Sequence, residues 1–379
     1  MSQLIDPFIL SVPEETLTDL KRRLENVRWP QRETVTDWSQ GVPLEKVRAL
    51  VAYWRDEYDW RRCEAMLNRF TQYKTEIDGV GVHFLHIRSL SPNALPLIMT
   101  HGWPGSVIEF HKVIGPLTDP AAHGLNPSDA FHLIIPSLPG YGFSDQPKDT
   151  GWAIPRIAKA WAVLMQRLGY DKYGAQGGDW GAVVTTHLGK LKPSGLIGVH
   201  VNLPLVLPEN PGETLSSEEA AMLQALRRHG LHESGYAEQQ ATRPQTLGYA
   251  LTDSPVGQAA WIYEKFKVWT DCDGEPENIL AYDEMLDNIM LYWLSGTAAS
   301  AGRLYWESYR TGFGGIEVEV PVGCSVFPRE IYRAPRSWAE RFFKNLTYWN
   351  ELDRGGHFAA FEQPALFAQE VRDCFRLMR

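Results

Sequence analysis

Short β-rich runs alternate with helical segments over most of this chain, and the alternation limits the folds that are open to it. Such runs are typical of strands, and they span residues 82–87, 97–100, 131–135, 197–201, 318–326 and 346–349. Strands that are separated by helices form βαβ units, whose strands pair in parallel. The sequence therefore predicts an α/β fold, with a mostly parallel central sheet flanked by helices.

Two regions depart from this alternation. The first begins with Ser11 to Glu14, which has the form of a capping box, and continues with helical patterns up to Trp29 and from Leu44 to Phe70. The second shows helical patterns alone, at 218–228, 258–269 and 282–303. We therefore expect an N-terminal helical segment packed on the core (1–75), a first part of the core (76–204), an inserted helical cap (205–315) and a second part of the core (316–379).

The composition argues against several classes of function. Hydrophobic residues make up 44% of the chain and charged residues 22%, which is ordinary globular usage. The net charge of −9, without a long basic run, argues against a nucleic-acid partner. The N-terminus lacks the features of a secretory signal, and no stretch approaches the length of a membrane span. We expect a cytoplasmic protein that acts on a small molecule.

The four cysteines are scattered through the chain without a C-x-x-C pair. This spacing indicates neither a disulfide framework nor a cysteine zinc site. His83 and His86 lie three apart in one predicted strand, so their side chains should point to opposite faces and form a poor metal pair. We expect the protein to need no metal and no organic cofactor.

The segment from Tyr173 to Gly181 carries the strongest chemical signal. It has the small-x-nucleophile-x-small form of a nucleophile elbow, a strained turn from strand to helix that needs small residues on both sides. Its central residue is Asp179, and a carboxylate nucleophile attacks saturated carbon to form an alkyl ester. The alternatives are a simple turn or a dinucleotide loop, but the glycines do not fit G-x-G-x-x-G.

The turn His101-Gly-Trp-Pro-Gly-Ser directly follows the predicted strand 97–100. In hydrolases with a nucleophile elbow, such a turn gives one backbone N–H to an oxyanion hole, and the residue after the nucleophile gives another. The two donors are then Trp103 and Trp180. We expect His101, Gly102 and Pro104 to contact the substrate. The alternative is that His101 is a buried, hydrogen-bonded core histidine and that the rest is a surface turn.

A histidine and an acid follow the nucleophile in the order expected for a catalytic triad. His357 lies between the last predicted strand and a C-terminal helix, where a loop histidine can reach the nucleophile as a base. Glu330 comes after the strand-like stretch 318–326, and it is the preferred acid. Asp353 is the rival, but it lies only four residues from His357 and is expected to make a surface contact.

With these motifs in view, the sequence resembles the epoxide hydrolases of the microsomal type, which have the α/β-hydrolase fold. The resemblance extends over almost the whole chain. It includes the elbow, the turn after residue 100, the block from Arg354 to Phe361, the segment from Pro7 to Pro30, and Gly323 to Glu330 around the acid. Membrane-bound members carry an N-terminal anchor that is not found in this sequence, so we expect no membrane anchor.

The resemblance also implies two cap tyrosines that hydrogen-bond the epoxide oxygen. Tyr236 ends Glu233-Ser-Gly-Tyr, which with the segments 253–257 and 264–266 matches the pattern of the family. The second tyrosine falls on Tyr305. The expected activity is hydrolysis of an epoxide to a vicinal diol. A homodimer is also possible, because apolar surface on the cap could pair two chains. Two alternatives remain open, a haloalkane dehalogenase and a non-catalytic small-molecule-binding homologue.

Overall fold

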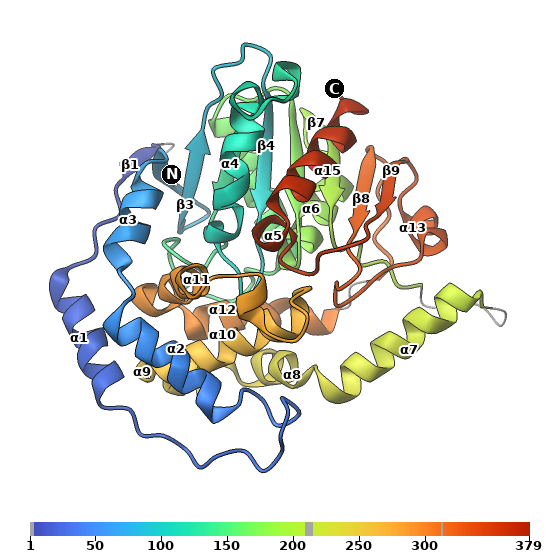
Figure 1. Ribbon diagram of the computed structural model, residues 1–379. Coiled ribbons are helices and arrows are strands. Elements are labelled where there is room, and N and C mark those ends of the chain that lie inside the picture. The colour runs from blue at the N-terminus through green and yellow to red at the C-terminus, as the bar shows by residue number, and fades with distance from the viewer. Residues whose placement is uncertain (1–3, 209–214, 312–313) are drawn as a thin grey trace.

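A nine-stranded sheet forms the centre of the described residues, 4–208, 215–311 and 314–379, in this computed structural model (Figure 1). The strand order is β1-β2-β3-β5-β4-β6-β7-β8-β9. The six strands from β5 to β9 in this order are parallel, and β3, β2 and β1 extend the sheet antiparallel. The bounds are β1 Asp6–Phe8, β2 Gln72–Ile77, β3 Val80–Ile87, β4 Leu95–Thr100, β5 Phe131–Pro136, β6 Tyr173–Gly177, β7 Leu196–Val201, β8 Val322–Val326 and β9 Leu346–Glu351.

The predicted parallel sheet is therefore present, and most of the predicted strands lie within the observed ones. The prediction for 318–326 was too long, because β8 begins only at Val322. Pro321 precedes it and has no N–H to donate to a neighbouring strand. Val318 instead forms an isolated bridge with Phe343.

Helices flank the sheet, and α4 and α15 pack side by side, as do α5 and α6 (Figure 1). The strongly apolar faces of α5 and α15 explain this packing, since burial of such a face stabilises a surface helix. The bounds of the helices of the core are α4 His111–Thr118, α5 Ile154–Arg167, α6 Trp180–Leu191, α13 Arg336–Phe342, α14 Ala359–Glu362 and α15 Pro364–Arg376, with short 3-10 helices at Val107–Phe110, Pro120–His123 and Pro127–Asp129.

The N-terminal region contains three helices, α1 Glu14–Glu25, α2 Leu44–Asp56 and α3 Trp60–Asn68. Two predictions about it were wrong. The capping box at Ser11 does not form, since Pro13 precedes α1 and no side chain caps the helix. The region is also not purely helical, because β1 and β2 pair with each other at the edge of the sheet. The stretch 44–70 divides where the Asp59 side chain accepts a hydrogen bond at the start of α3.

In the described part of the chain between β7 and β8, six further α-helices gather at one end of the sheet (Figure 1). We refer to them as the cap helices. The predicted helix 282–303 is divided by Gly296, which adopts the left-handed conformation that ends helices. The bounds are α7 Ser217–His232, α8 Gly235–Thr242, α9 Pro244–Asp253, α10 Pro255–Trp269, α11 Tyr282–Ser295 and α12 Ala298–Ser308, with short 3-10 helices at Pro276–Asn278 and Tyr309–Thr311.

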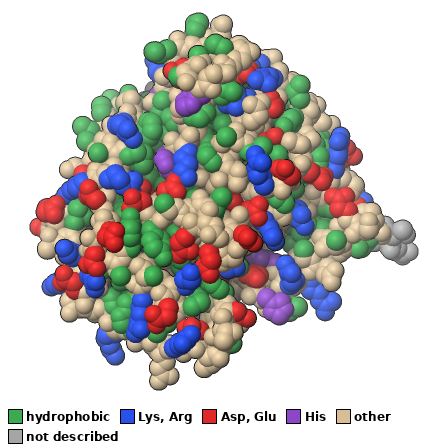
Figure 2. All heavy atoms as spheres, viewed as in Figure 1, with side chains coloured by type: hydrophobic (Ala, Val, Ile, Leu, Met, Phe, Trp, Pro, Cys, Tyr) green, Lys and Arg blue, Asp and Glu red, His purple; other side chains and the backbone are tan. Residues whose placement is uncertain are grey.

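The surface carries charges of both signs. Figure 2 shows acidic and basic side chains interspersed over the visible face, without a continuous basic patch. A nucleic-acid-binding surface would gather lysine and arginine on one face. In the part of the chain that the structure describes, no helix combines the length and the hydropathy needed to span a bilayer.

Candidate active site

The predicted elbow lies where β6 passes into α6. β6 ends at Gly177 and α6 begins at Trp180, so that Asp179 occupies the turn. Asp179 has φ 50° and ψ −131°, which is strained for a residue with a side chain. An ideal Cβ on Gly177 would lie 2.1 Å from the Gly181 carbonyl oxygen, and one on Gly181 would lie 1.9 Å from the Thr100 carbonyl oxygen. Only glycine permits these backbone approaches.

The turn that follows β4, with Trp103, contacts the Asp179 carboxylate. The Trp103 backbone N–H donates to Asp179 Oδ1 over 2.8 Å. Helix α11 anchors this turn, because Asn288 Nδ2 donates to the Pro104 carbonyl oxygen over 2.7 Å and the Tyr292 hydroxyl donates to the Gly105 carbonyl oxygen over 2.6 Å. One carboxylate oxygen of the candidate nucleophile is thus held by a backbone donor.

His357 and Glu330 lie beside the elbow, as the chain order predicted. His357 Nε2 is 3.3 Å from Asp179 Oδ2, and His357 Nδ1 is 2.5 Å from Glu330 Oε1. The Ile331 backbone N–H also donates to Glu330 Oε1 over 2.7 Å. The rival acid, Asp353, is exposed to solvent. The three side chains are connected in the order Asp179, His357, Glu330, with His357 between the two carboxylates.

The charge of His357 depends on its two neighbouring carboxylates. Burial alone would lower the pKa of His357, but the charge of Glu330 and the hydrogen bonds and charge of Asp179 outweigh burial and hold this pKa well above its ordinary value. His357 is therefore an imidazolium while Asp179 is ionised. If Asp179 were converted to a neutral ester, one of the two stabilising charges would disappear.

The two predicted cap tyrosines come together beside Trp103 and Trp180. The Tyr236 ring stacks on Trp103 with centroids 5.1 Å apart, and the Tyr305 ring meets Trp180 edge-on at 4.8 Å. The two phenol rings are 5.9 Å apart. Burial, together with the charge of Asp179, raises the pKa of each phenol well above its ordinary value. Both phenols are therefore protonated and can donate hydrogen bonds.

A cavity of about 160 Å³ joins the nucleophile to the two phenols. Its remaining wall is mostly apolar, and sequence reasoning found none of it, because these side chains lie on separate elements without a motif. Apart from Asp179, Trp180, Tyr236 and Tyr305, the cavity is lined by Val183, Leu203, Leu205, Leu226, His229, Tyr309, Ile331 and Tyr332.

His101, Gly102 and Pro104 are not among the residues that line this cavity, which differs from the expectation that they contact the substrate. His101 is buried, and its Nε2 accepts a hydrogen bond from the Leu138 backbone N–H over 3.2 Å. Burial lowers the pKa of His101 to about 4, so it is neutral at physiological pH. The alternative reading of His101, a hydrogen-bonded core histidine, fits these contacts.

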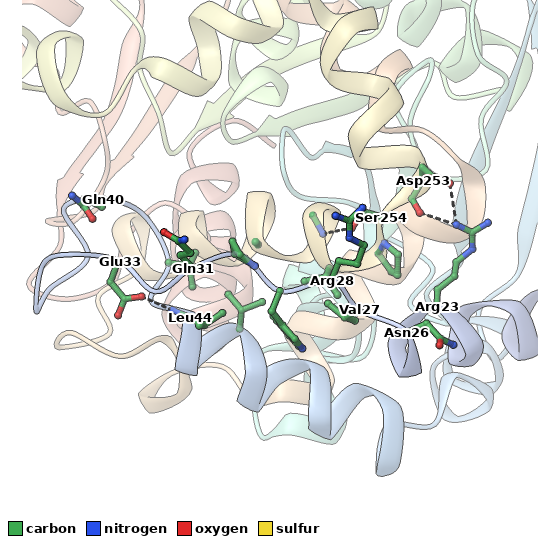
Figure 3. Close-up of a pocket in the computed structure, with 18 of the residues that line it drawn as sticks. Arg23, Asn26, Val27, Arg28, Gln31, Glu33, Gln40, Leu44, Asp253 and Ser254 are labelled. Carbon is green, nitrogen blue, oxygen red and sulfur yellow. Dashed lines mark hydrogen bonds and ion pairs between the residues drawn. The ribbon is translucent and has the colours of Figure 1, made fainter.

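A larger and more open cavity, of about 960 Å³, lies between the N-terminal segment and the cap (Figure 3). Its lining includes Arg23 and Asp253, which form an ion pair with N and O atoms 3.1 Å apart, and Glu33, which accepts from the Leu44 backbone N–H. None of the predicted catalytic residues lines it. Because the chemistry requires Asp179, we take the smaller cavity as the candidate substrate site.

The sheet order, the strained turn after β6 and the helices inserted between β7 and β8 define the class of the protein, an α/β hydrolase. The family described as "alpha/beta hydrolase fold" matches residues 96–225. The family described as "Epoxide hydrolase N terminus" matches residues 5–110.

The relatives narrow the class further. The chain is 63% identical to "Putative epoxide hydrolase" of Stigmatella aurantiaca, over 99% of this chain and 86% of the relative. It is 37% identical to "Epoxide hydrolase 1" of Sus scrofa, over 99% of this chain and 89% of the relative. The crystal structure of juvenile hormone epoxide hydrolase from Bombyx mori superposes with a TM-score of 0.90 at 32% identity, covering 99% of this chain and 95% of that one. The chain belongs to the epoxide hydrolase family.

Proposed function

We propose that the protein hydrolyses an epoxide to a vicinal diol through a covalent ester on Asp179. The observation that carries this proposal is the single cavity in which the Asp179 carboxylate faces two protonated phenols. An epoxide between them would meet a nucleophile at carbon and two acids at oxygen. Epoxide oxygen is a poor leaving group, so acids placed at that oxygen act on the main barrier.

In the first step Asp179 attacks one epoxide carbon while Tyr236 and Tyr305 donate hydrogen bonds to the opening oxygen. The product is a hydroxyalkyl ester, and the oxygen finally takes a proton from the imidazolium of His357. Loss of the Asp179 charge then favours the neutral imidazole, because the charge 3.3 Å away no longer stabilises the cation. The first step therefore converts His357 into the base that the second step needs.

In the second step neutral His357, oriented by Glu330, takes a proton from water, and the water oxygen attacks the ester carbonyl. The Trp103 N–H, which already donates to Asp179 Oδ1, supports the developing oxyanion. We assign the second donor to the Trp180 backbone N–H. Each such donor contributes about 2.7 to 4 kcal/mol to comparable transition states. Collapse of the intermediate releases the diol.

The two alternatives fit less well. A haloalkane dehalogenase also uses an aspartate, but halide leaves without a proton, so that enzyme would not need two buried phenols in the cavity wall. A non-catalytic homologue would not need the His357–Glu330 pair held 2.5 Å apart next to the nucleophile. The epoxide hydrolase mechanism uses each of these groups.

A single turnover in ¹⁸O-labelled water tests the ester. With enzyme in excess over a small aryl epoxide, the diol should contain unlabelled oxygen from Asp179, and the label should enter the Asp179 carboxylate. Label in the diol from the first turnover would show direct attack by water and would refute the ester. Turnover of a haloalkane, with the epoxide left unchanged, would support the dehalogenase instead.

We also propose that the enzyme is located in the cytoplasm. We further propose that it forms a homodimer through the cap. The four cysteines are buried and unpaired, which suits a reducing compartment. Tyr249 and Trp306 are 72% and 50% exposed on cap helices, and such apolar side chains favour contact with a second chain. Light scattering after gel filtration tests the dimer, and a monomer mass at micromolar concentration would refute it.

A further inference from the structure

A second, much smaller cavity adjoins the candidate nucleophile. Its volume is about 10 Å³, which suits one water molecule. Among the described residues, Asp179 alone lines both this cavity and the substrate cavity. The other residues of the small cavity are Gly102, Trp103, Glu109, Phe110, Gly178, Asn202, His357, Ala359, Ala360 and Phe367.

We infer that Glu109 is a positioning residue, which holds the hydrolytic water beside His357 and Asp179. This inference rests on the proposed function, because it needs an ester that water hydrolyses. The attacking water must place its oxygen on the carbonyl carbon of Asp179 and one hydrogen on His357 Nε2. Its second hydrogen then needs an acceptor, and without one the water is free to turn.

Glu109 is suited to this task by its place in the fold. It lies in the 3-10 helix Val107–Phe110, which follows the turn that carries Trp103. Its carboxylate accepts a hydrogen bond from the Ser106 backbone. An ideal Cβ on Gly105 would lie 1.2 Å from Glu109 Oε1, so the carboxyl group folds back onto the Gly105 backbone. Asn202, a further polar side chain of the lining besides Asp179 and His357, already accepts from Gln176 Nε2 through its Oδ1.

The charge state of Glu109 agrees with this role. Desolvation raises the pKa of Glu109 to about 8, against the opposing charge of His357, and the carboxylates of Asp179 and Glu330 raise it further. At neutral pH the carboxyl group is therefore mostly protonated. Its carbonyl oxygen can still accept a hydrogen bond from water, and it adds no negative charge beside the oxyanion that forms on Asp179.

Water, His357 and Asp179 account for every proton that moves in the hydrolytic step. The water oxygen bonds to the ester carbon while one proton moves to His357 Nε2. When the bond to the alkyl oxygen breaks, that oxygen takes the proton from His357 and leaves as the diol. The acid form of Asp179 then gives its proton to His357, which restores the ion pair of the resting enzyme. Glu109 exchanges no proton in this sequence, and it only orients the water.

The test measures the two half-reactions separately. Wild type, Glu109→Ala and Glu109→Gln are mixed with a small aryl epoxide and quenched with acid at successive times, and intact mass gives the alkylated fraction. In Glu109→Ala, alkylation should keep its wild-type rate, while hydrolysis of the ester should slow about 100-fold and the alkyl-enzyme should accumulate. Glu109→Gln keeps a neutral carbonyl acceptor and should restore most of the hydrolysis rate.

Glu370→Gln is the matched control, because Glu370 is a buried acid that lines neither cavity and accepts from Ser325 Oγ over 2.6 Å. It should lower the Tm without changing the ratio of the two rates. Wild-type hydrolysis in Glu109→Ala, or an equal loss in both steps, would overturn the inference about Glu109. If no variant, wild type included, is alkylated, the proposed function itself fails.

Discussion

The proposed change in the charge of His357 during turnover makes a quantitative prediction. The neutral ester is mimicked by Asp179→Asn, which removes one charge 3.3 Å from His357 Nε2. Two unit charges at this distance, with an effective dielectric constant of about 20, interact by about 5 kcal/mol. The pKa of His357 should therefore fall in Asp179→Asn, because the neutral amide no longer stabilises the imidazolium.

The assay is an NMR titration of the histidine rings in the two proteins, with His357 assigned by the loss of its signal in His357→Gln. His83 is an internal control, because burial lowers its pKa to about 3 and its ring should not titrate near neutral pH in either protein. If His357 titrates at the same pH in wild type and in Asp179→Asn, the charge of Asp179 does not control its protonation. The proposed change of His357 from an acid in the first step to a base in the second step would then be refuted.

Three further predictions concern single side chains. Tyr236→Phe and Tyr305→Phe should each slow alkylation, and together by about 10²- to 10⁴-fold, with little effect on ester hydrolysis in a quench experiment; equal slowing of both steps would contradict their role as acids. Gly181→Ala forces a Cβ against a backbone carbonyl and should lower the free energy of unfolding by about 1 to 3 kcal/mol in urea titrations. The control Gly230→Ala, in a helix with open space around it, should not destabilise the protein. Glu330→Gln should slow hydrolysis more than alkylation, since it leaves the nucleophile intact, and the reverse order would argue against this acid.

Much of the arrangement was predictable because its causes are local. A strained turn between a strand and a helix needs small residues on both sides of the nucleophile, and Gly177 and Gly181 are visible in the sequence itself. The parallel strands β4, β5, β7 and β9 contain the predicted β-rich runs, the run 318–326 extended beyond β8, and β6 was expected only as the strand before the elbow. The short edge strand β1 was missed, because three residues carry too little pattern and its pairing with β2 spans more than sixty residues of chain.

The functional residues of the cap could not be predicted from local sequence patterns. Tyr236 and Tyr305 were identified through the resemblance to the family, since nothing in their local sequence separates them from the other tyrosines. The residues that line the candidate substrate cavity, such as His229 and Leu203, come from different elements and meet only in the folded chain. Glu109 was missed for a similar reason, because its place beside His357 results from the fold of a turn that ends near Asp179.

The covalent ester on Asp179 is the central claim, and the intact mass of His357→Gln after incubation with a small aryl epoxide tests it most directly. In the proposed mechanism the variant lacks the base of the second step, whereas Asp179 and the two phenols of the first step are intact. Water can protonate the opened oxygen in place of His357, so the ester should form and persist. We expect a mass gain equal to the whole epoxide, located on the peptide that contains Asp179. An unmodified variant, under conditions in which the wild type converts the same epoxide to diol, would contradict the mechanism.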